Sequence, residues 1–266
     1  MNALICPLCS SALTENAQGL SCAQRHQFDR AKEGYFNLLP VQYKNSREPG
    51  DTSEQLLARR EFLSAGYFVP LLETLTYLVP AESASLLDIG CGEGYFTRAL
   101  SAKLKGADVY GVDIAKAGIR LAAKSDKRAT YAVASSHALP LADASVDVIT
   151  RIYAPSKDEE LVRTLHPDGT LIIVTPGVNH LLGLRKKIYH QIRSHPEPTA
   201  PQGFVSMAIH KVNFTLNVAA GAHATALLQM TPFAWKLPAD FREQYQTQNL
   251  VDEADFQIAL YQKISH

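Results

Sequence analysis

The stretch Ser85-Leu86-Leu87-Asp88-Ile89-Gly90-Cys91-Gly92-Glu93-Gly94-Tyr95 decides the fold. An apolar run reaches Asp88, a turn with three glycines follows, and Phe96, Leu100 and Leu104 then recur at helical spacing. The sequence therefore predicts a buried strand, a tight turn and a helix. In a doubly wound sheet the ligand lies beyond the carboxyl ends of the strands, and glycine at the first such turn lets the backbone approach it.

Strands and helices alternate after this stretch. Helices are expected at residues 115–124, 158–165 and 222–230, and strands at residues 108–113, 129–134, 146–152, 170–175, 214–218 and 255–261. This alternation predicts an α/β fold with a parallel sheet and crossover helices. Two amphipathic helices are expected before the stretch. The first opens with the capping-box spacing of Asp51 and Glu54, and the second carries Leu71, Leu75 and Leu78.

The glycine turn differs from that of a dinucleotide site. The dinucleotide pattern G-x-G-x-x-G needs glycine at position 95, where the chain has Tyr95. Gly90, Gly92 and Gly94 instead give G-x-G-x-G, which is typical of S-adenosylmethionine enzymes. The turn therefore predicts an S-adenosylmethionine site, and a fold that no longer binds the cofactor is the alternative.

Three acids accompany the turn. Asp113, at the end of the next strand, is expected to accept hydrogen bonds from the two ribose hydroxyls of the cofactor. Asp88 and Glu93 can face its cationic amino acid and sulfonium end, where carboxylates are electrostatically favourable. The predicted cofactor site thus combines the glycine backbone with carboxylates.

Three of the four cysteines lie in the first 22 residues. Cys6, Cys9, Cys22 and His26 follow the spacing C-x2-C-x12-C-x3-H, which places pairs of donor atoms on two tight turns, as a tetrahedral zinc requires. All four ligands come from the protein, so the zinc is expected to be structural. A single terminal histidine and the lack of a recognition-helix pattern disfavour DNA reading.

Charge and hydropathy exclude several functions. Among 266 residues, 26 basic side chains balance 26 acidic ones, so no chain-wide positive field collects nucleic acid. No apolar run approaches the roughly 18 residues of a membrane span. The N-terminus lacks the pattern of a secretory signal, and clustered cysteines in such a chain are more often metal ligands than disulfides. We expect a cytoplasmic protein without membrane contact.

Residues 178–213 form the most basic region. Their charged side chains other than histidine are Arg185, Lys186, Lys187, Arg193, Lys211 and the single acid Glu197. We interpret this region as an RNA-facing flap that neutralises phosphates, with a solvated charged connection as the alternative.

Seven segments of the chain match one known family. They are Cys6-Pro7-Leu8-Cys9, residues 22–29, residues 31–35, Asn37-Leu38-Leu39-Pro40, residues 87–95, Arg151-Ile152-Tyr153-Ala154-Pro155 and Thr231-Pro232-Phe233-Ala234-Trp235. On these segments the chain resembles the bacterial RlmA-type 23S rRNA (guanine-N(1))-methyltransferases, and the Gram-negative branch more closely. The combination of the cysteine pattern with the glycine turn makes this resemblance specific.

The resemblance implies a small N-terminal zinc ribbon fused to a Rossmann-like class I methyltransferase sheet. The expected division is a ribbon at 1–40, a helical linker at 41–84, and a methyltransferase domain at 85–266 with the basic insert. A homodimer and a guanine in a 23S rRNA stem-loop are also implied. By the same match, cofactor contacts fall on Gly92, Glu93 and His180, and on Phe68, where the family has tyrosine and stacking can remain.

Guanine N(1) is protonated and lies on the Watson–Crick edge, so the target base must be unpaired or flipped and must lose its proton. Tyr153 is expected to stack on this base, with ordinary packing at a strand end as the alternative. Arg151 is expected near a phosphate or the guanine oxygen. Two competing functions stay open: a small-molecule, quinone-type methyltransferase, and a non-catalytic zinc-dependent RNA-binding module.

Overall fold

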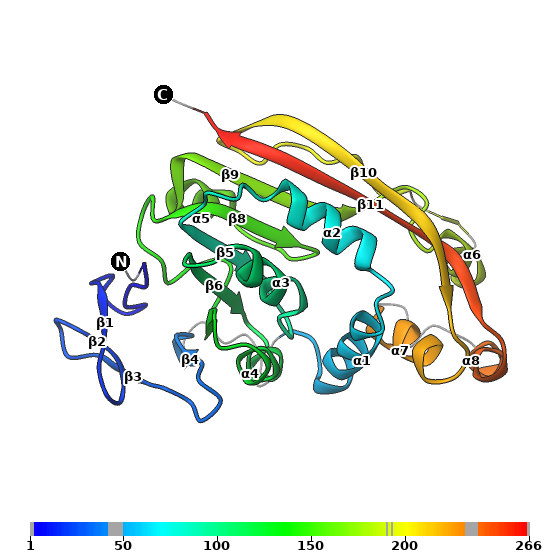
Figure 1. Ribbon diagram of the computed structural model, residues 1–266, viewed down its shortest axis with the longest axis horizontal. Helices are drawn as coiled ribbons and strands as arrows, with labels where there is room; N and C mark the ends of the chain where they lie inside the picture. Colours follow the sequence, from blue (N-terminus) through cyan, green and yellow to red (C-terminus); the bar gives the residue numbers. More distant parts are fainter. Residues whose placement is uncertain (1–2, 42–49, 190, 193, 232–238, 265–266) are drawn as a thin grey trace.

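The computed structural model describes residues 3–41, 50–189, 191–192, 194–231 and 239–264 (Figure 1). Its N-terminal part is a three-stranded antiparallel sheet in the order β1-β2-β3, made of β1 (Leu13–Glu15), β2 (Gly19–Cys22) and β3 (Gln27–Asp29). Bridges from Leu4 to Leu141 and from Ile5 to Ala12 tie the first residues to the loop at 134–145, between two strands of the main sheet, and to the segment before β1. The ribbon is therefore joined to the rest of the molecule.

The main sheet has eight strands in the order β10-β11-β9-β8-β5-β6-β7-β4. The strands are β4 (Phe36–Asn37), β5 (Ser85–Ile89), β6 (Asp108–Asp113), β7 (Thr130–Val133), β8 (Val146–Ile152), β9 (Leu165–Pro176), β10 (Phe204–Val218) and β11 (Leu250–Lys263). The strands from β9 to β4 pair in parallel, and β11 runs antiparallel between β9 and β10. This arrangement confirms the predicted parallel sheet. The short β4 lies within the expected ribbon segment 1–40, yet it pairs with β7.

Apolar side chains cover both faces of the main sheet. The helices are α1 (Ser53–Ser64), α2 (Val69–Leu78), α3 (Tyr95–Lys103), α4 (Lys116–Ser125), α5 (Asp158–Thr164), α6 (Leu182–Ile188), α7 (Ala222–Met230) and α8 (Ala239–Thr247). On one face, α1, α2, α3 and α7 pack over Leu86 and Val148 (Figure 1). On the other, the ribbon and α5 pack over Leu87 and Ile149. Side chains that alternate along β5 and β8 are thus buried on both faces, which explains the consecutive apolar pairs Leu86-Leu87 and Val148-Ile149.

The expected helices and strands form, with corrections at their ends. Helix α1 begins one residue later than predicted, because its capping box joins Thr52 and Gln55: the Thr52 hydroxyl accepts from Gln55 N, and Gln55 Oε1 accepts from Thr52 N. The predicted pair of Asp51 and Glu54 is therefore wrong. Instead, Asp51 pairs with Arg59 of the same helix at 2.5 Å.

The basic region 178–213 is not one loop. It contains α6, a loop through residues 194–203, and the first ten residues of β10, which begins at Phe204 and not near 214. Antiparallel pairing with β11, from Phe204↔Lys263 to Val218↔Leu250, holds the whole strand. The composition of residues 204–213 does not predict this pairing, because it depends on a distant strand. His190 and Arg193 lie outside the described residues, as do residues 232–235 of the matched segment at 231–235.

Within the part of the chain that the structure describes, none of the helices has both the length and the apolar character to cross a lipid bilayer.

Candidate functional site

The four predicted metal ligands converge in the ribbon. One donor atom from each of Cys6, Cys9, Cys22 and His26 lies within 4.8 Å of the other three. Cys6 Sγ and Cys22 Sγ each lie 3.4 Å from His26 Nδ1, and Cys9 Sγ lies 3.7 Å from Cys22 Sγ. Zinc–sulfur bonds of about 2.3 Å and zinc–nitrogen bonds of about 2.0 Å place tetrahedral ligands roughly 3.5–3.8 Å apart. The donor set therefore fits a single structural zinc ion.

The pKa values of the Cys9 and Cys6 thiols are shifted in opposite directions. Ser11 hydrogen bonds beside Cys9 lower the pKa of that thiol to about 6, which favours the thiolate that binds zinc. Burial raises the pKa of Cys6. Zinc binding displaces the thiol proton. The positive charge of the metal therefore stabilises the Cys6 thiolate, which burial alone disfavours.

The glycine turn after β5 is held by two close approaches. Gly90 has φ 71°, and a side chain there would place its Cβ 2.3 Å from Ala154 Cβ, so the turn lies directly against the loop after β8. Gly92 has φ 54°, and its added Cβ would meet only Arg59 Nη1 at 3.7 Å and Leu56 at 4.0 Å. The turn is therefore packed at Gly90 and open at Gly92, as a cradle for a ligand requires.

The two aspartates of the cofactor prediction have separate tasks. Asp113 Oδ2 accepts a hydrogen bond from Gly92 N at 2.9 Å, and Oδ1 accepts one from Ala115 N at 2.7 Å, so this carboxylate fixes the turn from β6. Asp88 is 2% exposed, and its oxygens accept from Thr97 Oγ1 at 2.5 Å and Thr150 Oγ1 at 2.8 Å. Asp88 therefore ties α3 and β8 to β5 beneath the turn.

Burial dominates the protonation of these acids. It raises the pKa of Asp88 to about 6 against the opposing threonine hydrogen bonds, and it also raises the pKa of Asp113. A cationic ligand nearby would oppose this effect and stabilise the charged form of both carboxylates.

Glu93 provides the strongest sign of a missing cationic or hydrogen-bond-donating ligand. Its side chain is 2% exposed, and Oε2 has no hydrogen-bond partner among the described residues. Burial raises its pKa, and the charges of Arg98, Arg60 and Arg59 act in the opposite direction. A buried carboxylate oxygen without a donor is costly, so the amino acid end of S-adenosylmethionine fits beside the open turn.

An aromatic cluster lies where β8 and β9 end. The rings of Tyr153 and His180 lie 6.1 Å apart, and His180 lies 4.8 Å from Phe256 of β11. Tyr153 has φ 55°, a conformation that costs about 1–2 kcal/mol outside glycine, and its side chain is 49% exposed. Tyr153 thus combines a strained backbone with a half-exposed ring and precedes Ala154, which contacts the glycine turn, and its stacking on a base stays a prediction.

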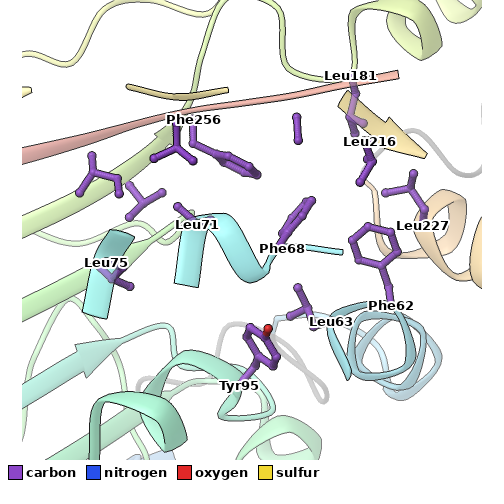
Figure 2. Packing of buried hydrophobic residues seen from close by; sticks show 14 of the residues in the cluster. Phe62, Leu63, Phe68, Leu71, Leu75, Tyr95, Leu181, Leu216, Leu227 and Phe256 are labelled. Carbon is purple, nitrogen blue, oxygen red and sulfur yellow. The ribbon is translucent and has the colours of Figure 1, made fainter. Parts of the chain in front are cut away.

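The other predicted residues are more enclosed. Phe68 is 6% exposed and packs edge-on against Phe62 and Phe256 at centroid distances of 5.0 and 4.9 Å, between α1 and β11 (Figure 2). Arg151 Nη1 donates to Ser156 Oγ at 2.6 Å, and burial lowers the pKa of its guanidinium. A cofactor contact at Phe68 and an RNA contact at Arg151 both stay predictions.

His180 is a neutral side chain in this site. Burial, helped by His195 and Arg185, lowers its pKa to about 4. Its Nδ1 accepts a hydrogen bond from Asp255 N at 3.3 Å. In the neutral ring the proton therefore lies on Nε2, which can donate to a ligand.

Sequence reasoning missed three participants. Arg59 of α1 reaches the open side of Gly92, Phe256 supports the aromatic cluster, and Asp255 holds the backbone around His180. The capping-box spacing predicted the helix that carries Arg59 but did not indicate that this side chain reaches the glycine turn. Phe256 and Asp255 lie on a strand more than 70 residues from the segments they contact, so no local spacing could identify them.

Comparisons with known proteins agree with both parts of the site. A family model described as "RlmA, N-terminal" matches residues 4–47, and one described as "Methyltransferase domain" matches residues 87–173. A putative 23S rRNA (guanine-N(1)-)-methyltransferase of Bacillus subtilis is 33% identical over 88% of this chain and 88% of its own. The 23S rRNA (guanine(748)-N(1))-methyltransferase of Streptomyces fradiae is 30% identical over 89% of this chain and 87% of its own.

Proposed function

Because this chain belongs to the RlmA family of 23S rRNA (guanine-N(1))-methyltransferases, and is an S-adenosylmethionine-dependent methyltransferase with a zinc ribbon, we propose that it methylates N(1) of a guanine in a 23S rRNA stem-loop. One observation carries the proposal. Tyr153 has a strained backbone and a half-exposed ring, and it directly precedes Ala154, which packs against Gly90 of the glycine turn, where a flipped base would meet the methyl donor.

The side chains divide the work between cofactor and base. S-adenosylmethionine supplies a methyl group on a positively charged sulfur when bound. Gly92 leaves room for it, Asp113 fixes the turn and offers acceptor oxygens for the ribose, and Glu93 faces its amino acid end. Tyr153 provides a stacking surface, whose contribution for one base is on the order of 1–3 kcal/mol. Positioning of this kind provides much of the acceleration in methyl transfer.

The cellular context follows from the substrate. We infer a cytoplasmic enzyme, since rRNA is made and assembled there. We infer a homodimer. The exposed Val205, Met207 and Ile209 on edge strand β10 support it, because apolar side chains on an edge strand favour pairing with another chain. The division into residues 1–40, 41–84 and 85–266 is part of the same proposal.

Transfer of labelled methyl groups to a 23S rRNA transcript, followed by nucleoside analysis, tests the proposed function. We expect 1-methylguanosine with the wild-type protein and about 10²-fold less with Tyr153→Ala, because the stacking surface is lost. Calorimetric titration with S-adenosylmethionine, run alongside, should show similar affinity for both proteins. Cofactor binding without any methylation of rRNA would favour the small-molecule enzyme, and no cofactor binding would favour the RNA-binding module.

A further inference from the structure

Asp255 lies at the point where β11 passes the end of β9. The register pairs its neighbour Phe256 with Pro176, the last residue of β9, so Asp255 is level with the loop that leaves the parallel sheet. Its backbone holds that loop, because Asp255 O accepts from Gly177 N at 2.8 Å and Asp255 N donates to His180 Nδ1 at 3.3 Å. The residue is 8% exposed. It is therefore fixed beside the aromatic cluster.

Only one of the two carboxylate oxygens of Asp255 accepts a hydrogen bond from the described residues. Oδ2 accepts a hydrogen bond from Asn179 N at 2.9 Å, whereas Oδ1 receives no hydrogen bond from the described residues. A side chain at position 177 would place its Cβ 2.2 Å from Oδ1 and from Cγ, so glycine at that position is what lets the carboxylate lie there. The packing thus keeps one oxygen available in a sheltered position.

Two neighbours of this oxygen, Tyr153 and His180, are not free to take a proton from a base. Burial and the charge of Asp255 raise the pKa of Tyr153 well above its ordinary value, so the phenol keeps its proton. His180 already accepts a hydrogen bond on Nδ1, and its other ring nitrogen carries the proton. Burial lowers the pKa of His195, and the charge of Asp255 acts on it in the opposite direction. Asp255 is the anionic group shared by Tyr153 and His195.

We propose that Asp255 accepts the N(1) proton of the target guanine, an inference that rests on the proposed function. With the base stacked on Tyr153, Oδ1 accepts the N(1)–H hydrogen bond. N(1) then gives its proton to Oδ1 and uses the freed electron pair to bond the methyl carbon, while the carbon–sulfur bond breaks and its electrons neutralise the sulfonium. A carboxylate also accepts from the guanine N2 amino group, whereas adenine has an acceptor at N(1), so the same residue selects guanine.

The test compares Asp255→Asn with Glu253→Gln. The amide of Asn can still accept the Asn179 hydrogen bond, so the loop keeps its support while the proton acceptor is lost. Glu253 lies two residues away on the same strand and accepts hydrogen bonds from the side chains of Asn179 and Asn213, which glutamine can also accept. We expect D255N to lower kcat for 1-methylguanosine formation by about 10²–10⁴-fold, the usual range for a lost general base, and E253Q to stay within about twofold of wild type.

Two further readouts separate proton acceptance from support of the loop. Affinity for S-adenosylmethionine, measured by calorimetry, should be unchanged in D255N and in a second variant, Asp255→Ser. The rate of D255N should rise steadily toward alkaline pH, where solvent removes the N(1) proton, whereas wild type should depend less steeply on pH because Asp255 takes that proton. The groups that face Asp255 are Tyr153, His180, His195 and Arg185. Removal of the Asp255 charge in D255N lowers the pKa of Tyr153 and of His195, and D255S shares this shift because it lacks the same charge.

The outcomes are distinct. Equal rates of wild type and D255N at neutral pH, or a D255N rate with the pH dependence of wild type, would overturn the role of Asp255 while leaving the proposed function intact. A wild-type protein that forms no 1-methylguanosine would overturn both.

Discussion

At the scale of single residues, the backbone φ of a glycine and the space around it affect different properties, namely stability and ligand binding. Gly92 and Gly106 have φ values of 54° and 87°, so both resist substitution by similar backbone strain. An added Cβ at Gly106 meets nothing within 4 Å, whereas one at Gly92 would project toward Arg59 and Leu56, on the open side of the turn. Substitution of either glycine is expected to reduce stability, whereas only substitution of Gly92 is expected to reduce ligand binding.

We expect Gly92→Ala to lose S-adenosylmethionine affinity by tenfold or more, because its methyl group fills the space beside the turn. Gly106→Ala should bind the cofactor as wild type does. Both should lower the free energy of unfolding by about 1–2 kcal/mol, the cost of alanine in a left-handed conformation. Calorimetric titration and denaturant unfolding measure the two quantities. Similar affinities in the two variants would remove Gly92 from the cofactor site.

At the scale of elements, α6 changes the interpretation of the basic region. Arg185 is 6% exposed, and its Nη1 donates to Val178 O at 3.1 Å and His180 O at 3.3 Å. Lys187 lies over the ring of Phe241 at 4.6 Å. These two cations therefore brace the loop around His180 and the contact with α8, while the neighbouring Lys186 is exposed. Arg185 therefore points into the protein, and the interpretation of residues 178–213 as an RNA-facing flap stays a prediction.

Single substitutions on α6 should accordingly differ. Arg185→Ala is expected to lower the free energy of unfolding by about 1–3 kcal/mol, because two partly buried carbonyls lose a donor, and to lower kcat by displacing His180. Lys186→Ala should leave the unfolding free energy unchanged and weaken RNA binding with a flatter salt dependence. Denaturant unfolding and filter binding at several salt concentrations measure these effects. A salt dependence in K186A equal to that of wild type would make this helix a solvated connection.

The helices and strands themselves were largely predictable. The apolar run before Gly90 and the spacing of Leu71 and Leu75 fix β5 and α2, because burial on one or both faces imposes a period on the sequence. Strand β4 escaped prediction since two residues carry no period, and β10 was shortened because an edge strand with many exposed side chains has no continuous apolar pattern.

At the scale of the whole molecule, the zinc ribbon is part of the core. Leu4, Leu13 and Leu20 are buried in the same cluster as Leu87 of β5, and Ala3 N donates to the hydroxyl of Tyr110 on β6 at 3.0 Å. A ribbon of this size has little apolar interior of its own, so the metal contributes much of its folding free energy, on the order of 10 kcal/mol in zinc-finger peptides. Metal loss should therefore also uncover one face of the main sheet.

We expect about one zinc per chain by mass spectrometry. Chelation, or Cys22→Ser, should lower the melting temperature and speed hydrogen exchange in β2 and in β6, because β6 loses its cover. Cys91→Ser, which alters the one cysteine outside the metal cluster, should retain the zinc and the slow exchange of β2. A fully folded protein without zinc, in which β2 still exchanges slowly, would contradict the structural role of the metal.

The sequence by itself determined the features that depend on neighbours along the chain. These are the metal knuckles, the glycine turn with its acids, and the order of strands and helices, since spacing alone sets which donor atoms or apolar faces come together. The tertiary structure alone decided that Asp255 meets Gly177 and His180, and that Arg185 turns inward. Those contacts join segments through the register of β9 and β11, and sheet register is set by the packing of whole faces rather than by local spacing.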